Sequence, residues 1–299
     1  MVIASASMHG AAESPSDRRS ASAARVRRIL VLLALSCSLA CASSLTAAKI
    51  SRAQPAPDAA SGLAQKLQNP IGDLISVPFQ NNFNLAVGPQ HWPQNVMNIQ
   101  PVVPVHLDDT LNLITRTILP VVWNGGSKPG HSNFGLGATT FSAFFSPRHQ
   151  VNGWGWGSGP ALQIPTATDT ALGSNIWGMG PAVVVVKTTK SIVGGVLAND
   201  VISLGGTSGA SGTRYNTLTI NPFLNFNFSD GWFIGSVPII TANLDSHGAK
   251  WTLPIGLQGG RLIMLGHYPV NLLAGAYYNV LRQSYGGNWQ LRAQFAFVF

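Results

Sequence analysis

The sequence has little charge and no long apolar run. Only 9% of its 299 residues are charged and 45% are hydrophobic, whereas soluble domains carry about 25% charged residues. A membrane-spanning helix requires about 20 consecutive apolar residues, and the longest apolar run in the middle of the chain, 182–186, is far shorter. Because lipid accepts only helices and closed barrels, this composition predicts a β-barrel.

Cysteine and glutamate are almost absent. Both cysteines, Cys37 and Cys41, and the single glutamate, Glu13, lie near the N-terminus. We therefore expect a mature chain without a disulfide, although it would pass through an oxidising compartment. Eleven basic and eight acidic residues remain from Gln54 onward, a net charge of about +3. This small charge removes the main support for a nucleic-acid partner, and we predict none.

The N-terminus has the order of segments found in a secretory signal peptide. Basic residues precede the apolar run 29–35, and small residues follow it. Cleavage after Ala42, Ala48 or Ala53 fits this pattern, so we assign residues 1–53 to a leader. A short anchor helix is the alternative, and the run is too short for it. The basic residues are Arg25, Arg27 and Arg28.

Residues 54–73 form a short segment rich in proline and alanine. Leu63 and Leu67 lie at helical spacing, and Pro70 closes the pattern. A short periplasmic helix and a disordered tail both fit, and the sequence does not decide between them.

The last segment of the chain, 289–299, has the period of two that is typical of a transmembrane strand. One face carries Trp289, Leu291, Ala293, Phe295, Phe297 and Phe299, and the other carries Gln290, Arg292, Gln294, Ala296 and Val298. A terminal phenylalanine on such an aromatic face resembles the signal by which bacterial outer-membrane barrels are recognised. We therefore expect the barrel assembly machinery to bind the strand that ends at Phe299.

Twelve stretches with this alternation predict an all-β fold, an antiparallel transmembrane β-barrel of about 12 strands over residues 74–299. Short links alternate with longer ones, as expected for periplasmic turns and outer loops, and an even count places both termini on the periplasmic side. The predicted strands are 74–87, 96–106, 111–123, 134–145, 151–164, 175–187, 192–204, 214–228, 232–243, 249–262, 270–282 and 289–299.

The positions of the tryptophans support the predicted barrel, whereas those of several prolines count against it. Seven tryptophans lie mostly near predicted strand ends, where interfacial girdles belong. Five prolines lie inside predicted strands, where each removes a ladder hydrogen bond, and we expect their rings on the inner, water-facing side. The tryptophans are Trp92, Trp123, Trp154, Trp177, Trp232, Trp251 and Trp289, and the prolines are Pro78, Pro104, Pro120, Pro238 and Pro254.

Several stretches carry a resemblance to a known family. They are 74–82, 98–101, 113–120, 229–232, 238–243, 251–254 and 269–280. Over residues 63–299 the chain resembles the bacterial outer-membrane transporters related to the phenol meta-cleavage (MetA-type) pathway proteins, some of which carry the label neuromedin U. The resemblance implies a barrel with a transport role. It implies no substrate and no catalytic residue.

Enzymatic and metal-binding chemistry has weak support. His131 and Ser132 are the best candidates for a lipid hydrolase, but adjacent strand residues point to opposite faces. The histidines are scattered, without the spacing that metal sites favour. The acidic pair Asp108 and Asp109 fits a tight turn better than a cation site. We therefore predict no enzyme, no metal site and no cofactor.

The inner face of the predicted barrel carries mostly neutral amides with a few cations. Such a lining favours small neutral or weakly anionic solutes, aromatic ones among them, over a strong charge filter. We predict a monomeric outer-membrane channel in contact with lipid, whose permeant the sequence does not identify. A non-conducting structural or surface-binding barrel is the alternative. The predicted lumen-lining residues are Gln80, Asn82, Asn98, Gln100, Asn112, Arg116, Lys250, Thr252, Gln258, Gln290, Arg292 and Gln294.

Overall fold

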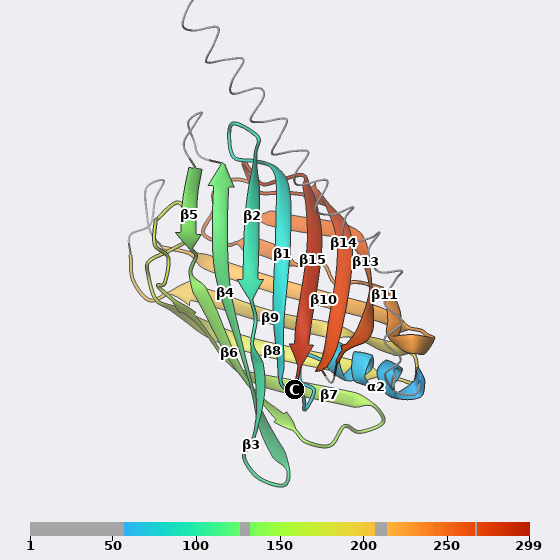
Figure 1. The fold of residues 1–299 in the computed structure, drawn as a ribbon. Helices are drawn as coiled ribbons and strands as arrows, with labels where there is room; N and C mark the ends of the chain where they lie inside the picture. Colours follow the sequence, from blue (N-terminus) through green and yellow to red (C-terminus); the bar gives the residue numbers. More distant parts are fainter. Residues whose placement is uncertain (1–56, 126–131, 207–213, 267) are drawn as a thin grey trace, which may run out of the picture. The chain divides into compact units, whose positions relative to one another are not determined.

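The computed structural model describes residues 57–125, 132–206, 214–266 and 268–299. The predicted leader 1–53 and His131 lie outside these residues, as does the side chain of Ser132. The elements are α2 (Pro57–Gln68), β1 (Ser76–Val87), β2 (Trp92–Ile99), β3 (Val102–His106), β4 (Leu111–Gly125), β5 (Ser132–Leu136), β6 (Thr139–Pro147), β7 (Trp154–Ile164), β8 (Gly178–Thr188), β9 (Ile192–Ser203), β10 (Asn216–Asn227), the 3-10 turn η1 (Ser229–Gly231), β11 (Trp232–Ser236), β12 (Ile240–Asn243), β13 (Trp251–Leu265), β14 (Tyr268–Leu281) and β15 (Trp289–Val298) (Figure 1).

One antiparallel sheet closes on itself. Each strand pairs with its neighbours in the chain, and β1 pairs with the last strand, β15, from Ser76 opposite Val298 to Leu85 opposite Trp289. Because β2 and β3, β5 and β6, and β11 and β12 are each one interrupted strand, the barrel has 12 strands. The predicted fold class and strand count are confirmed. Among the described residues, no helix is long and apolar enough to cross a membrane.

Three strands that were predicted to be continuous are interrupted in the structure. The stretch 96–106 breaks between Ile99 and Val102, the stretch 134–145 breaks between Leu136 and Thr139, and the stretch 232–243 breaks between Ser236 and Ile240. Prolines lie in two of these gaps. A proline has no N–H for the ladder, so the strand is interrupted there. The local bonding is restored at the first gap, where the Thr117 N–H donates to the Pro101 carbonyl over 3.0 Å. Pro238 therefore lies in a gap rather than inside a strand.

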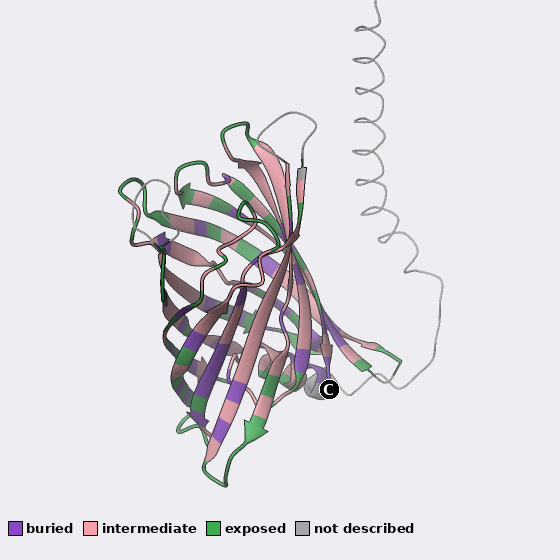
Figure 2. Ribbon diagram, turned by 90° about the vertical axis from the view of Figure 1, so that its left-hand side faces the viewer, coloured by how far each residue is buried: buried purple, intermediate pink, exposed green. Residues whose placement is uncertain are grey.

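The outer face of the barrel is apolar. Exposed and buried residues alternate along the strands (Figure 2). In β13, Ile255 and Leu257 are 61% and 63% exposed, whereas Pro254 and Gln258 are buried. Large apolar side chains that face outward from a closed barrel have lipid as their natural surroundings.

The tryptophans confirm the predicted girdle positions. Trp92, Trp154, Trp232, Trp251 and Trp289 are each the first residue of a strand. At the end with the short links, Arg261 lies over the Trp232 ring and Lys187 lies over the Trp154 ring, each at 5.1 Å from the centroid. A cation on an aromatic face is the pairing expected where a barrel leaves lipid for water.

Two of the five prolines can be placed on the inner face directly. Pro78 lines an interior cavity, and buried Pro254 alternates with exposed Ile255. The Pro78 carbonyl still accepts a hydrogen bond of 2.9 Å from the Gln100 N–H. The predicted orientation is correct for these two rings.

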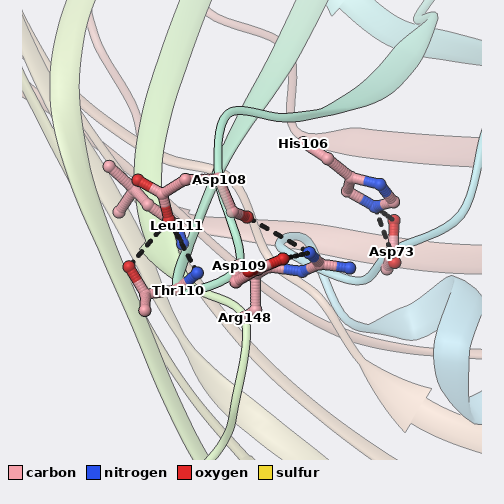
Figure 3. A network of polar contacts seen from close by, with 7 residues as sticks. All are labelled: Asp73, His106, Asp108, Asp109, Thr110, Leu111 and Arg148. Atoms are coloured by element: carbon pink, nitrogen blue, oxygen red, sulfur yellow. Dashed lines mark hydrogen bonds and ion pairs between the residues drawn. The ribbon is translucent and has the colours of Figure 1, made fainter.

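The turn between β3 and β4 is built on Asp108 (Figure 3). Its carboxylate accepts hydrogen bonds from the Thr110 hydroxyl at 2.7 Å, the Thr110 N–H at 2.6 Å and the Leu111 N–H at 2.9 Å. These donors, with the hydroxyl first, lower the pKa of Asp108 below its ordinary value of 3.8. Turn chemistry thus explains the acidic pair, as the sequence predicts.

Asp108→Ala should lower barrel stability at neutral pH, because it removes three hydrogen bonds to an ionised acceptor. A depressed pKa stabilises the fold above the unfolded value and ceases to do so as pH falls through the folded value. The deficit should therefore shrink below pH 3.8. Thermal unfolding of detergent-refolded protein measures it. Asp109→Ala is the control, because that side chain is fully exposed and has only a 4.0 Å contact with Arg148. Equal effects of the two variants at neutral pH would contradict this account of the turn.

Leu257→Arg should destabilise the barrel in lipid vesicles by about 2–4 kcal/mol, the cost of a cation near the bilayer midplane. Leu265→Arg is the matched control, since Leu265 is also 63% exposed but lies at the end of the same strand. There the cost should be about 0–1 kcal/mol. Folding titrations in denaturant measure both values, and equal costs would show that this face does not meet the hydrocarbon.

Candidate functional site in the barrel interior

Three cavities lie in the barrel interior and at its short-link end. We call them the upper, middle and lower cavities, with the lower one beside the short links and α2. Their volumes are about 250, 190 and 520 Å³. Neighbouring cavities share lining residues, so the three lie in series with a partition between each pair.

The partition between the upper and middle cavities is a neck of side chains from the barrel wall. Its residues line both cavities: Gln80, Gln100, Arg116, Leu197, Asn221, Val237 and Arg292. Two of the seven are cations, and none is an acid. Among the described residues, no Asp or Glu lines either cavity. The potential at the neck is therefore positive.

Arg292 is fixed in place by acceptors around it. It is 4% exposed, and its guanidinium donates to Asn82 Oδ1 at 3.2 Å, the Val237 carbonyl at 2.8 Å and Gln290 Oε1 at 3.0 Å. The guanidinium also lies 4.5 Å from the centroid of the Tyr277 ring. All these partners are neutral, so they orient the cation without cancelling its charge.

Arg116 is held less tightly. Its Nη2 donates to Gln100 Oε1 at 2.8 Å, and this is its one hydrogen bond to the described residues. Arginine has five N–H groups, so most of the donors of Arg116 are unused. Arg116 is thus the neck cation best able to bind an anion.

A chain of amides crosses the wall above the neck. Gln290 donates to Asn84, Asn84 donates to Gln94, and Gln94 donates to Asn124, over 3.0, 2.9 and 2.8 Å. Asn124 then donates to the Ala171 carbonyl at 3.1 Å. This chain ties β15, β1, β2 and β4 to the link after β7, and it gives the upper interior a neutral polar surface.

The partition between the middle and lower cavities is formed by the end of α2 and the residues after it, which we call the strap (residues 66–74). Lys66, Asn69 and Gly72 line both cavities. Figure 1 shows α2 at the same end of the barrel as the C-terminus. The sequence left a helix and a disordered tail open here; the structure has a twelve-residue helix. Residues of this segment contact the barrel wall at its short-link end.

Polar contacts hold the strap to the wall at both ends. Gln68 and Asn227 exchange two hydrogen bonds, of 2.8 and 3.0 Å. Asp73 contacts the imidazole of His106 at 2.9 and 3.0 Å (Figure 3). Both pairs join residues far apart in the sequence, so the periodicity of the chain gave no sign of them.

An apolar contact holds the middle of the strap. Ile71 is 8% exposed and packs into a cluster of inward side chains, and burying an isoleucine contributes about 1.5–3 kcal/mol. The cluster comes from β4 and β6 to β10, so one side of the interior is apolar while the side formed by β14, β15, β1 and β2 is polar. The other cluster members are Ile114, Phe144, Ala161, Ala182, Val184, Val186, Val193, Leu197, Val201 and Phe223.

Three asparagines of the middle cavity have unmet hydrogen-bonding capacity. The carbonyl oxygens of Asn221, Asn225 and Asn271 are buried without a partner among the described residues. Such an oxygen costs about 1–3 kcal/mol. Asn221 and Asn225 share a face of β10, so the alternation of that strand could have revealed them, although they are not among the predicted lumen-lining residues.

The structure brings most of the predicted lumen residues together. The cavities or their hydrogen-bond networks contain Gln80, Asn82, Asn98, Gln100, Arg116, Gln258, Gln290, Arg292 and Gln294. Thr252 pairs with Thr241, which pairs with Thr219 of the upper cavity, so Thr252 shares the inner face.

Asn112, also predicted to line the lumen, lines the lower cavity, beyond the strap. One predicted residue lies elsewhere. Lys250 precedes β13, and its ammonium donates to the Leu244 carbonyl at 3.2 Å in the same link. Lys250 therefore lies outside the three cavities. The alternation predicted it inside a strand, but β13 begins one residue later, at Trp251.

Comparison with solved structures agrees with this architecture. An outer membrane channel from Pseudomonas putida F1 has a TM-score of 0.55 and 16% identity, over 77% of this chain and 97% of that one. The NanC porin matches over 75% of this chain and 98% of its own, with 9% identity and a TM-score of 0.48, which is too low to establish a shared fold. No family model and no curated protein matches the sequence. The likeness shows a fold of the outer-membrane channel type.

Ile71→Asp should release the strap, because an unpaired carboxylate in the apolar cluster costs several kcal/mol. With the partition removed, single-channel conductance in planar bilayers should rise. Ile75→Asp is the control, since Ile75 follows the strap but is 41% exposed. Equal conductance of both variants and the parent chain would show that the strap does not obstruct the path.

Proposed function

We propose that this chain is a passive channel of the bacterial outer membrane for small neutral or weakly anionic organic solutes. The neck carries this proposal: Arg116 and Arg292 both line it, and no acid of the described residues lines either cavity beside it. A positive constriction admits anions more readily than cations.

The outer surface supports the membrane location. The exposed apolar side chains and the tryptophans at strand starts are those of a barrel in lipid. The predicted signal peptide supports export, and short links are typical of the periplasmic side. On this orientation the lower cavity and α2 face the periplasm.

Cations continue along the proposed path below the neck. Lys66 lines both the middle and the lower cavity, and Arg148 lines the lower one. The acid of the lower cavity, Asp73, is engaged by His106. An anion would therefore meet a basic side chain at each stage of its passage.

The apolar side of the interior supports an organic permeant with an apolar body. Leu197 and Val237 of the neck, and Phe223 of the middle cavity, offer surface that small inorganic ions do not use. The resemblance to transporters related to the phenol meta-cleavage pathway also supports aromatic solutes as candidates.

Assembly and chemistry complete the proposal. We infer a monomer, because β15 closes the barrel within one chain. We also infer insertion through the barrel assembly machinery, because Phe299, which follows β15, is 64% exposed and can be recognised. We also infer passage without a catalytic step, metal or cofactor. A non-conducting structural or surface-binding barrel is the alternative that the following measurement addresses.

Arg116→Gln should reduce the preference for chloride over potassium by about thirtyfold, because a unit charge at close range in a water-like medium changes the energy of each ion by about 1 kcal/mol, in opposite directions. The reversal potential of the refolded chain in a salt gradient across a planar bilayer measures this preference. Arg116→Lys should retain it. Arg261→Gln is the control, since this cation lies over Trp232 at the outer surface.

Two outcomes would count against the channel. A cation preference in the parent chain would contradict the assigned role of the neck. Absence of current in both the parent chain and Ile71→Asp would favour the non-conducting barrel.

A further inference from the structure

We propose that the middle cavity is a saturable binding site for a small organic oxyanion, a carboxylate with an apolar body. This inference rests on the proposed channel function and adds a site of residence on the path. The site is bounded above by the neck and below by the strap. The residues argued below come from β4, β10, β11 and β14.

Asparagine N–H groups form one part of the site. Asn225 and Asn271 are 3% and 6% exposed and line the cavity. For each of them, and for Asn221, the carbonyl oxygen is buried without a partner, and the side-chain nitrogen donates no hydrogen bond to the described residues. Since each side chain lines the cavity, we place its N–H groups toward the cavity. Each amide offers two unused N–H groups.

The guanidinium of Arg116 forms the second part. It uses one donor, toward Gln100, and no carboxylate among the described residues lies within ion-pair distance of it. A planar guanidinium with free N–H groups binds a carboxylate in a bidentate fashion. Together with the amides it makes a lining of donors, which suits a ligand with several acceptor oxygens and repels a cation.

An apolar wall forms the third part. Phe223 lies between Asn221 and Asn225 on the inner face of β10, and Phe233 and Leu273 line the same cavity. A hydrated inorganic ion gains nothing from this surface, whereas a ring or alkyl body is removed from water there. The donors and the wall together favour benzoate over acetate, and benzoate over its uncharged analogue benzyl alcohol.

Calorimetric titration of the full, detergent-refolded chain with sodium benzoate tests the site without requiring conductance. Benzoate should bind saturably, and acetate and benzyl alcohol should each bind about tenfold more weakly, because each lacks one of the two recognised features. Equal affinity for the three compounds, or no saturable heat with benzoate, would overturn the proposal.

Substitutions in the cavity separate this site from the neck. Asn225→Leu and Asn271→Leu keep the side-chain size and remove the donors, so together they should weaken benzoate binding about tenfold while the chloride preference set by Arg116 remains. Asn81→Leu is the matched control: its carbonyl oxygen is also buried without a partner, but it alternates with inward Gln80 and faces outward. Unchanged benzoate affinity in the double variant would overturn the site.

A further variant tests the site if the double variant does not fold. Asn225→Asp keeps the shape and adds a negative charge to the cavity, so benzoate affinity should fall more steeply than it does in Asn225→Leu. Weaker binding in the aspartate variant supports the site, and unchanged binding overturns it. A cation preference of the parent chain, with benzoate binding intact, would instead refute the proposed function alone.

Discussion

The backbone pairing between β1 and β15 is the constraint on which the rest of the structure depends. Lipid offers no partner for a free N–H or carbonyl, so an edge strand cannot persist there and the sheet must close. Closure is made by the first and last strands, with Gln80 opposite Gln294 and Asn82 opposite Arg292. The same pairing therefore seals the barrel and places the polar side chains of two distant segments next to each other, and two of them, Gln80 and Arg292, line the neck.

Local alternation explains how much could be predicted from the sequence. A strand has a period of two, so the inward positions of Gln80, Gln100 and Arg292 followed from the sequence, as did the outward aromatic face that ends at Phe299. Alternation contains no information on contacts between distant segments. The strap was missed because its contacts are of that kind: Gln68 meets Asn227 at a separation of 159 residues, and Ile71 packs among side chains of β4 and β6 to β10.

Irregular positions account for the remaining errors. A proline in a gap, such as Pro101 or Pro238, interrupts a strand whose apolar pattern continues on both sides, so the pattern alone joins the two halves. Lys250 has the spacing of an inward residue but lies before the first residue of β13. In each case the alternation predicts which face of the strand a residue is on, but not where the strand begins or breaks.

The interior combines two features that work against stability, and both lie on the proposed path. Arg116 keeps most of its donors unused, and three amides leave their carbonyl oxygens buried without partners. Neighbouring regions show that the chain can provide partners for such groups. In the amide chain from Gln290 to Asn124 every carbonyl oxygen accepts a hydrogen bond and every nitrogen donates one, and Arg292 is surrounded by acceptors. These three amides and Arg116 all line the middle cavity, between neck and strap. A solute that supplies acceptor oxygens would complete this part of the interior, whereas the strap and the closed ladder around it are complete in its absence.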